Sequence, residues 1–162
     1  RSQAILALES KVVDFAAVTS PLTIQKPLHK THLASYREIL IGGTKYKELA
    51  SQIRSLNDLS GIPVIGLADG TGTRELYHRY FLSHGLMFAP DMEAATTDQI
   101  LPMITHNLGI GFYPEELAAE AIARGSAYAI RLVEPIPERE ICLVTNSSTQ
   151  MSAAVRKVIS FL

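Results

Sequence analysis

The sequence predicts an α/β fold in which mixed, mostly parallel sheets carry helices on both faces. Expected strands alternate with expected helices along the 162 residues, and most of the strands are continuous apolar runs. Such runs are typical of strands that are buried on both faces of a sheet. The strands are expected at residues 14–19, 32–42, 63–67, 92–95, 110–113, 128–133 and 140–145.

Helix boundaries follow from capping residues and from the spacing of apolar side chains. Helices are expected at residues 2–10, 45–54, 72–84, 96–107 and 115–124, with a last helix after residue 147. Thr96 with Gln99, and Ser147 with Gln150, have the spacing of a capping box. Pro102 falls inside one of these helices and should bend it or remove one backbone hydrogen bond.

Composition limits what the chain can be. With 47% hydrophobic residues it can bury a core, as one domain or as two small lobes. The 15 basic and 16 acidic residues leave a net charge of −1, so the chain lacks the excess of positive charge that is typical of nucleic-acid-binding domains. No apolar run reaches the roughly 18 residues of a membrane span. The single cysteine, Cys142, cannot form an internal disulfide; we expect it in a buried strand, and the protein in the cytoplasm.

Residues 62–81 are the most informative segment. An apolar run leads through a turn rich in glycine and threonine into a helix whose core face is expected to carry Leu76, Tyr77, Tyr80 and Phe81. Such a turn directs backbone N–H groups, hydroxyls and the positive end of a helix dipole to one place. The groups concerned are Gly70, Thr71, Gly72 and Thr73. These groups favour a site for a small anion. A strand-to-helix turn without a ligand is the alternative interpretation.

A nucleotide site is an alternative reading of the same turn. Gly70 and Gly72 match the first two glycines of G-x-G-x-x-G, and Glu93 follows at about the distance of the ribose-binding acid. Glu75, however, stands where close helix packing needs a small residue. The alternative function is a nucleotide-dependent enzyme that uses the Gly70-Thr71-Gly72 turn. No Walker loop is present.

Three other expected strands also end in polar or aromatic residues. Thr19 and Ser20 end one, Thr96 and Thr97 follow another, and a third ends in Phe112 and Tyr113. Ligands of open α/β sheets bind at the carboxyl ends of strands, and convergent polar groups suit a small polar ligand. Thr96 is explained first as a helix cap, and a cap on a cleft wall can also contact a ligand.

The residues that could perform catalysis form no recognisable set. The five histidines (His29, His32, His78, His84 and His106) lack metal-ligand spacing, and H-E-x-x-H, G-x-S-x-G and C-x-x-C are absent. We therefore expect no enzyme activity, no metal and no cofactor.

Several segments, in this order, resemble the effector-binding domain of LysR-type transcriptional regulators. They are residues 13–19, 36–41, 56–65, 107–114 and the last strand and helix. The resemblance covers essentially the whole chain. It implies a two-lobed fold similar to type II periplasmic binding proteins, with residues 1–61 and 144–162 in lobe one, residues 62–143 in lobe two, and an effector cleft between them.

The resemblance also implies what surrounds this domain. The family's winged helix-turn-helix and the first part of lobe one have no counterpart here, so lobe one is expected to be incomplete. DNA would be bound only by the absent N-terminal domain, and the full-length protein would be a homodimer or tetramer.

By position, the resemblance implies a ligand set rich in threonine. Its members are Thr19, Ser20, Gly70, Thr71, Gly72, Thr73, Thr96, Thr97, Phe112 and Tyr113. The set is similar to that of family members that sense a carboxylate, an inorganic anion or another oxygen-rich metabolite. A solute-binding protein of related fold is a further alternative.

Overall fold

The structure, a computed structural model, describes residues 3–162 and divides the chain into two compact units. Unit 1 combines residues 3–35 with Arg139–Leu162. Unit 2 is Tyr36–Glu138. Each unit has its own sheet and its own buried apolar cluster.

This division differs from the expected one at both boundaries. The sequence placed residues 36–61 with the first lobe and residues 139–143 with the second. Residues 36–61 belong to unit 2 because β3 (Glu38–Gly42) pairs with two strands of that unit. Residues 139–143 belong to unit 1 because β8 (Arg139–Asn146) pairs with β1 (Phe15–Thr19). Strand pairing between distant segments, which no local pattern reveals, sets both boundaries.

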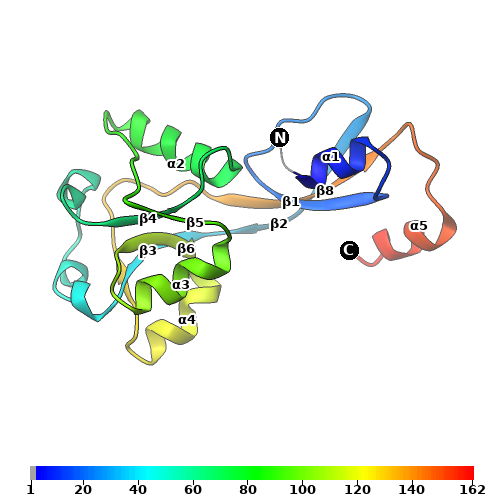
Figure 1. The fold of residues 1–162 in the computed structure, drawn as a ribbon. Coiled ribbons are helices and arrows are strands. Elements are labelled where there is room, and N and C mark those ends of the chain that lie inside the picture. The colour runs from blue at the N-terminus through cyan, green and yellow to red at the C-terminus, as the bar shows by residue number, and fades with distance from the viewer. Residues whose placement is uncertain (1–2) are drawn as a thin grey trace. The chain divides into compact units, whose positions relative to one another are not determined.

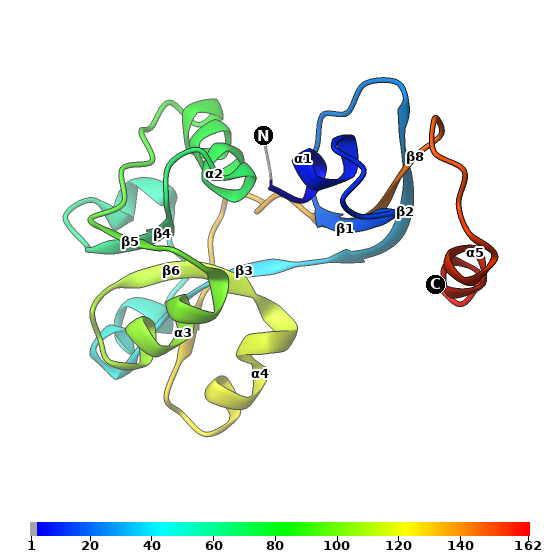
Figure 2. The ribbon, with the colours of Figure 1, turned by 45° about the vertical axis from the view of Figure 1, so that its right-hand side comes forward.

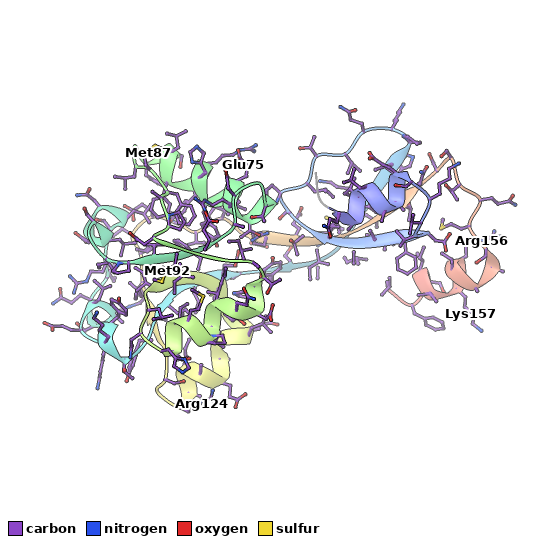
Figure 3. The ribbon with its side chains drawn as sticks, viewed as in Figure 1. Glu75, Met87, Met92, Arg124, Arg156 and Lys157 are labelled. Atoms are coloured by element: carbon purple, nitrogen blue, oxygen red, sulfur yellow. The ribbon has the colours of Figure 1, made fainter. Side chains whose placement is uncertain are left out.

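Unit 1 is built on a three-stranded sheet of order β1-β8-β2, with β2 at Leu28–Tyr36. β1 and β8 are antiparallel. Helix α1 (Gln3–Glu9) packs on this sheet (Figure 2), and the cluster beneath it consists of Ile5, Leu8, Leu28 and Val144. Helix α5 (Ala153–Ile159) contributes no buried residue. Its last turn carries Arg156 and Lys157 (Figure 3), which suit the negative end of the helix dipole.

Unit 2 is built on a five-stranded sheet of order β5-β4-β6-β3-β7. β4 is parallel to β5 and β6, whereas β3 is antiparallel to β6 and β7. The mixed α/β fold is thus confirmed, but the sheets are not mostly parallel, because β3 enters between β6 and β7 from the opposite direction. The elements after β3 are the 3-10 helices η1 (Thr44–Tyr46), η2 (Leu49–Ser51) and η3 (Leu56–Leu59), then β4 (Val64–Leu67), α2 (Gly72–Ser83), β5 (Met92–Ala94), α3 (Thr97–Thr105), β6 (Ile110–Pro114), α4 (Glu115–Ala123) and β7 (Tyr128–Ile130).

Both faces of the five-stranded sheet are covered, as the sequence predicts. Figure 1 shows α2 on one face and α3 and α4 on the other. Because side chains alternate along a strand, Leu40 joins the cluster under α2 while Ile41 joins the cluster under α3 and α4. The expected stripe on α2 is confirmed, since Tyr77, Tyr80 and Phe81 are buried in the first cluster and Leu76 packs against it.

Two helix predictions fail locally. The helix expected at residues 45–54 is replaced by η1 and η2, and the chain then leaves helical geometry at Gln52 so that the Arg54 N–H can bond the Arg131 carbonyl. The last helix begins after Ser152, whose hydroxyl accepts from the Val155 N–H. Ser147, the expected cap, instead donates its hydroxyl to the Pro27 carbonyl at 2.8 Å.

Candidate functional site

The carboxyl ends of three neighbouring strands lie at one edge of the unit 2 sheet. β4 and β5 run in register with Leu67 opposite Ala94, and β4 and β6 run parallel with Ile65 opposite Gly111. The segments that leave these strands carry most of the expected ligand groups. They are Gly70, Thr71, Gly72 and Thr73 after β4, Thr96 and Thr97 after β5, and Tyr113 in β6.

The turn after β4 is shaped by its own hydrogen bonds. Gly70 has φ +83°, a conformation that favours glycine. Thr71 caps α2, because its hydroxyl accepts from the Arg74 N–H at 3.1 Å and donates to the Ala68 carbonyl at 2.9 Å. Its hydroxyl is therefore committed to the turn. The Gly72 N–H has no acceptor within residues 3–162 and is exposed at the start of the helix.

The start of α3 leaves two hydroxyls available. Thr96 is the N-cap by backbone geometry, with φ −137° and ψ 155°, but its side chain makes no capping hydrogen bond. In a capping box the Gln99 side chain would accept from the N–H of the N-cap residue, Thr96. It accepts instead from the N–H of Ala95, at 2.9 Å. Thr96 and Thr97 are both exposed. The expected capping box is thus only half formed, and both threonines present exposed hydroxyls at the edge.

Phe112 and Tyr113 point to opposite faces of the sheet. Phe112 is 5% exposed and stacks on Tyr77 with ring centroids 4.2 Å apart, so its ring is occupied by the core and we leave it out of the candidate set. Tyr113 is buried on the face that carries α3. Burial, and then the negative charge of Asp98 in the first turn of α3, raise the pKa of Tyr113. Its hydroxyl keeps its proton at neutral pH.

Arg74 brings a positive charge to the same edge, and the sequence reasoning gave it no role. Its Nη1 donates to the Leu67 carbonyl at 2.8 Å and to Glu93 Oε1 at 3.2 Å. Its guanidinium also lies over the ring of Phe88, 5.6 Å from the centroid. A cation in the first turn of a helix opposes the helix dipole. An arginine at this unfavourable position was the feature of the sequence that could have indicated a role for Arg74. Its contacts with Leu67, Glu93 and Phe88 offset the unfavourable interaction with the helix dipole.

The edge becomes acidic beyond β6. Glu38 opens β3 opposite Pro114, is 6% exposed, and accepts a hydrogen bond from the Tyr77 hydroxyl at 3.0 Å. A buried carboxylate there disfavours a second negative charge. The donor-rich part of the edge is therefore the part formed by β4, β5 and β6.

Two cavities of unit 2 lie away from the hydrogen-bond donors of this edge. One of about 350 Å³ is lined by Leu59, Phe81 and Met87, among others, near the start of β4 (Met87 is labelled in Figure 3). Another of about 340 Å³ lies between the first residues of β3 and the segment after β7. Neither cavity is lined by the strand-end hydroxyls. The edge is therefore proposed as the ligand site because of its hydrogen-bond donors and not because of a cavity.

Thr19 and Ser20, the remaining expected ligand residues, belong to unit 1. Thr19 ends β1 and is exposed, and Ser20 follows it. Arg139, a second residue that sequence reasoning missed, donates to both of them. Cys142 is a free, buried residue of β8, as expected.

Within residues 3–162 no three His, Cys, Asp or Glu side chains are placed to hold a metal ion. Among the helices of that same range, none has the length and apolar character needed to cross a bilayer.

Comparison with known families decides what kind of domain this is. The family described as "LysR substrate binding domain" matches residues 1–162. The chain belongs to this family. Membership confirms the resemblance drawn from the sequence motifs, and with it the type II periplasmic-binding-protein-like α/β fold.

Solved regulatory domains share the fold of this LysR substrate binding domain. The effector binding domain of QuiR in complex with shikimate gives a TM-score of 0.82 at 16% identity, covering 97% of this chain and 73% of that one. The regulatory domain of CcmR from Synechocystis PCC6803 in complex with 2-PG gives 0.82 at 17% identity, covering 98% and 76%.

A curated relative is the uncharacterized HTH-type transcriptional regulator YeiE of Escherichia coli (strain K12). It is 24% identical over 142 residues, which are 85% of this chain and 48% of that protein. The chain thus spans about half the length of the curated relatives it matches.

Proposed function

We propose that this LysR substrate binding domain senses a small anionic or oxygen-rich metabolite at the β4-β5-β6 edge of unit 2 and does not transform it. The observation that carries the proposal is the gathering of hydrogen-bond donors at that edge. The Gly72 N–H, the exposed hydroxyls of Thr96 and Thr97, and the protonated Tyr113 hydroxyl can all donate.

Electrostatics supports an anion in particular. The starts of α2 and α3 place the positive ends of two helix dipoles beside these donors, and Arg74, which is paired with Glu93 at 3.2 Å, adds a side-chain cation. Hydrogen bonds to a charged acceptor are about twice as strong as neutral ones. A carboxylate or an inorganic oxyanion would therefore gain most from this edge.

The relatives support the same class of ligand. QuiR is described with shikimate, a hydroxylated carboxylate, and CcmR with 2-PG. We propose a ligand of this kind for the present chain as well. At the level of the whole protein, we propose a cytoplasmic LysR-type transcriptional regulator that forms a homodimer or tetramer and binds DNA through another domain. The effector would then shift a pre-existing conformational equilibrium.

Binding measurements test the proposal. Shikimate, inorganic phosphate and sulfate are titrated into the chain by calorimetry, with thermal stabilisation as a second readout. We expect at least one anion to bind, and Thr96→Val or Thr97→Val to weaken it roughly tenfold, because each loses one charge-assisted hydrogen bond.

Thr105→Val is the matched control, since it removes a hydroxyl at the other end of α3, where Thr105 donates to the Pro102 carbonyl. Its affinity should equal that of the wild type. No binding of any of the three anions, or equal affinity in all variants, would contradict the proposal.

A further inference from the structure

A cavity of about 350 Å³ lies at the opposite edge of the unit 2 sheet, where β4 and β5 begin. Its wall is formed by residues within the segments 56–64 and 86–91 and by Phe81 of α2, so the whole cavity belongs to unit 2. We call it the amino-edge cavity. Ligand pockets of proteins have volumes of roughly 300–1,000 Å³, so this one has room for a small organic molecule.

The inner wall of the amino-edge cavity is apolar and partly aromatic. Leu59, Phe81 and Phe88 are each at most 7% exposed and belong to the buried cluster under α2. The rings of Phe81 and Phe88 have centroids 4.9 Å apart. Met87 lines the same cavity but is 68% exposed (Figure 3). Because a methionine side chain is flexible and polarizable, Met87 can adapt to the shape of an apolar ligand.

Three polar side chains complete the wall. They belong to Asn57, Ser60 and Asp91, all of which are exposed. Within residues 3–162 the Asn57 amide and the Ser60 hydroxyl make no hydrogen bond, so both remain for a ligand. An amide and a hydroxyl can each donate or accept, and they therefore do not decide which charge the cavity favours.

Asp91 decides that charge. Its Oδ2 accepts from the Val64 N–H at 2.9 Å, and its own N–H donates to the Val64 carbonyl at 2.8 Å, so the carboxylate is held at the start of β4. In the described part of the chain Asp91 pairs with no cation, and no Lys, Arg or His lines the cavity. The other large cavity of unit 2 differs, because side chains of both signs, among them Arg131 and Glu134, line it.

We propose that the amino-edge cavity is a second small-molecule site of this chain, which binds an organic cation with an apolar, ring-sized body. The body would contact Phe81, Phe88 and Met87, and the cationic group would pair with Asp91. An ammonium group also interacts favourably with the face of an aromatic ring. This inference goes beyond the proposed function and does not depend on it, because no residue of the β4-β5-β6 edge takes part.

An NMR titration of the isotope-labelled chain with 2-phenylethylamine, which is protonated at neutral pH, tests the proposal. We expect saturable amide shifts at Ser60, Met87 and Asp91, and none at Gly72 or Thr96. Two partial probes separate the requirements. 2-Phenylethanol keeps the ring without the charge and should bind about fivefold more weakly. Ethylamine keeps the charge without the ring and should not saturate over the same concentration range.

Variants test the charge of the site. Asp91→Asn keeps an oxygen that can accept from the Val64 N–H, so it should fold and should bind 2-phenylethylamine about fivefold more weakly. Asp69→Asn is the matched control, because it removes an exposed carboxylate after the other end of β4 and should leave the affinity unchanged.

A second pair of variants adds a positive charge. Met87→Lys places a cation at the cavity and should weaken binding at least about fivefold by repulsion. Leu117→Lys makes the same change at a 60% exposed position of α4, which does not line the cavity, and should bind as the wild type does.

The outcomes are distinct from those of the anion titrations. Equal affinity for 2-phenylethylamine and 2-phenylethanol, or equal affinity in Asp91→Asn and Asp69→Asn, overturns the inferred preference for a cation. Shifts confined to residues outside the cavity, or no saturable shift with 2-phenylethylamine, overturn the site itself. Neither result bears on whether shikimate, phosphate or sulfate binds at the β4-β5-β6 edge.

Discussion

The two units achieve order in different ways. The sheet of unit 2 has an apolar cluster on each face, and one of the two is an aromatic group in which Tyr77, Tyr80, Phe81, Phe88 and Phe112 contact one another. Unit 1 has one small buried cluster beside α1. Its helix α5 contains no buried residue, and Val158 on that helix is 49% exposed.

The difference shows where stability and polar order are expected to reside. Buried apolar area stabilises by roughly 25 cal/mol per Å², so unit 2 should hold most of the hydrophobic free energy. In unit 1, hydrogen bonds from Arg139 hold the end of β1. The sheet edge of unit 2 and the end of β1 in unit 1 both carry hydroxyl side chains.

The largest effect is expected in the aromatic cluster. Phe112→Ala should lower the free energy of unfolding by about 3–5 kcal/mol, because it removes a ring and leaves a cavity that stiff neighbours cannot fill. Urea denaturation followed by circular dichroism measures it. Leu117→Ala is the control, since Leu117 of α4 is 60% exposed, and it should change stability by no more than about 0.5 kcal/mol. A loss below about 1 kcal/mol for Phe112→Ala would contradict the packing described.

A smaller loss is expected in unit 1. Leu8→Ala should cost about 2–3 kcal/mol, because Leu8 is 1% exposed but belongs to a small cluster. The same denaturation experiment applies, with Leu6→Ala on the same helix as the control, since Leu6 is 46% exposed. If Leu8→Ala cost as much as Phe112→Ala, the contrast between the units would be wrong.

The smallest effect concerns alkaline pH. Burial, and then the charge of Glu134, raise the pKa of Tyr80, whose hydroxyl donates to the Glu134 carbonyl at 2.9 Å. Because the folded pKa lies above the unfolded value of about 10, this contribution is complete below about pH 10 and is lost as the pH rises further.

Tyr80→Phe should therefore flatten the loss of stability above pH 10, while costing about 0.5–1.5 kcal/mol at neutral pH for the missing hydrogen bond. Denaturant titrations at pH 8 to 11 measure both. Glu134→Gln removes only the second cause and should flatten the slope less. An unchanged slope in Tyr80→Phe would rule out this tyrosine as its source.

Local signals in the sequence located most elements. β4, β5 and β6 begin and end within about a residue of their expected bounds, because apolar runs and flanking turns are local properties. The direction of β3 and the membership of residues 36–61 depend on pairing with β6 and β7, far along the chain. The hydrophobic periodicity of a short sequence segment does not reveal which distant strands that segment pairs with.

The candidate site divides in the same way. The strand-end threonines could be named from sequence, because a strand followed by a capped helix is a local pattern. Arg139 could not, because its acceptors, Thr19 and Ser20, are 120 and 119 residues away. Phe112 was expected to contact the ligand, but side chains alternate between the two faces of the sheet, and that of Phe112 points into the core. The face to which a strand residue points depends on the strand register, which the sequence motif alone does not give.

The most direct test of the sensing edge is an NMR titration of the isotope-labelled chain with shikimate, phosphate and sulfate. The account predicts saturable amide shifts at Gly72, Thr96 and Thr97, at the carboxyl edge of the unit 2 sheet. Val64 and Asp91, which lie at the other end of β4, should stay unchanged. Shifts concentrated around Val64 and Asp91, or no saturable shifts with any of the three anions, would contradict it.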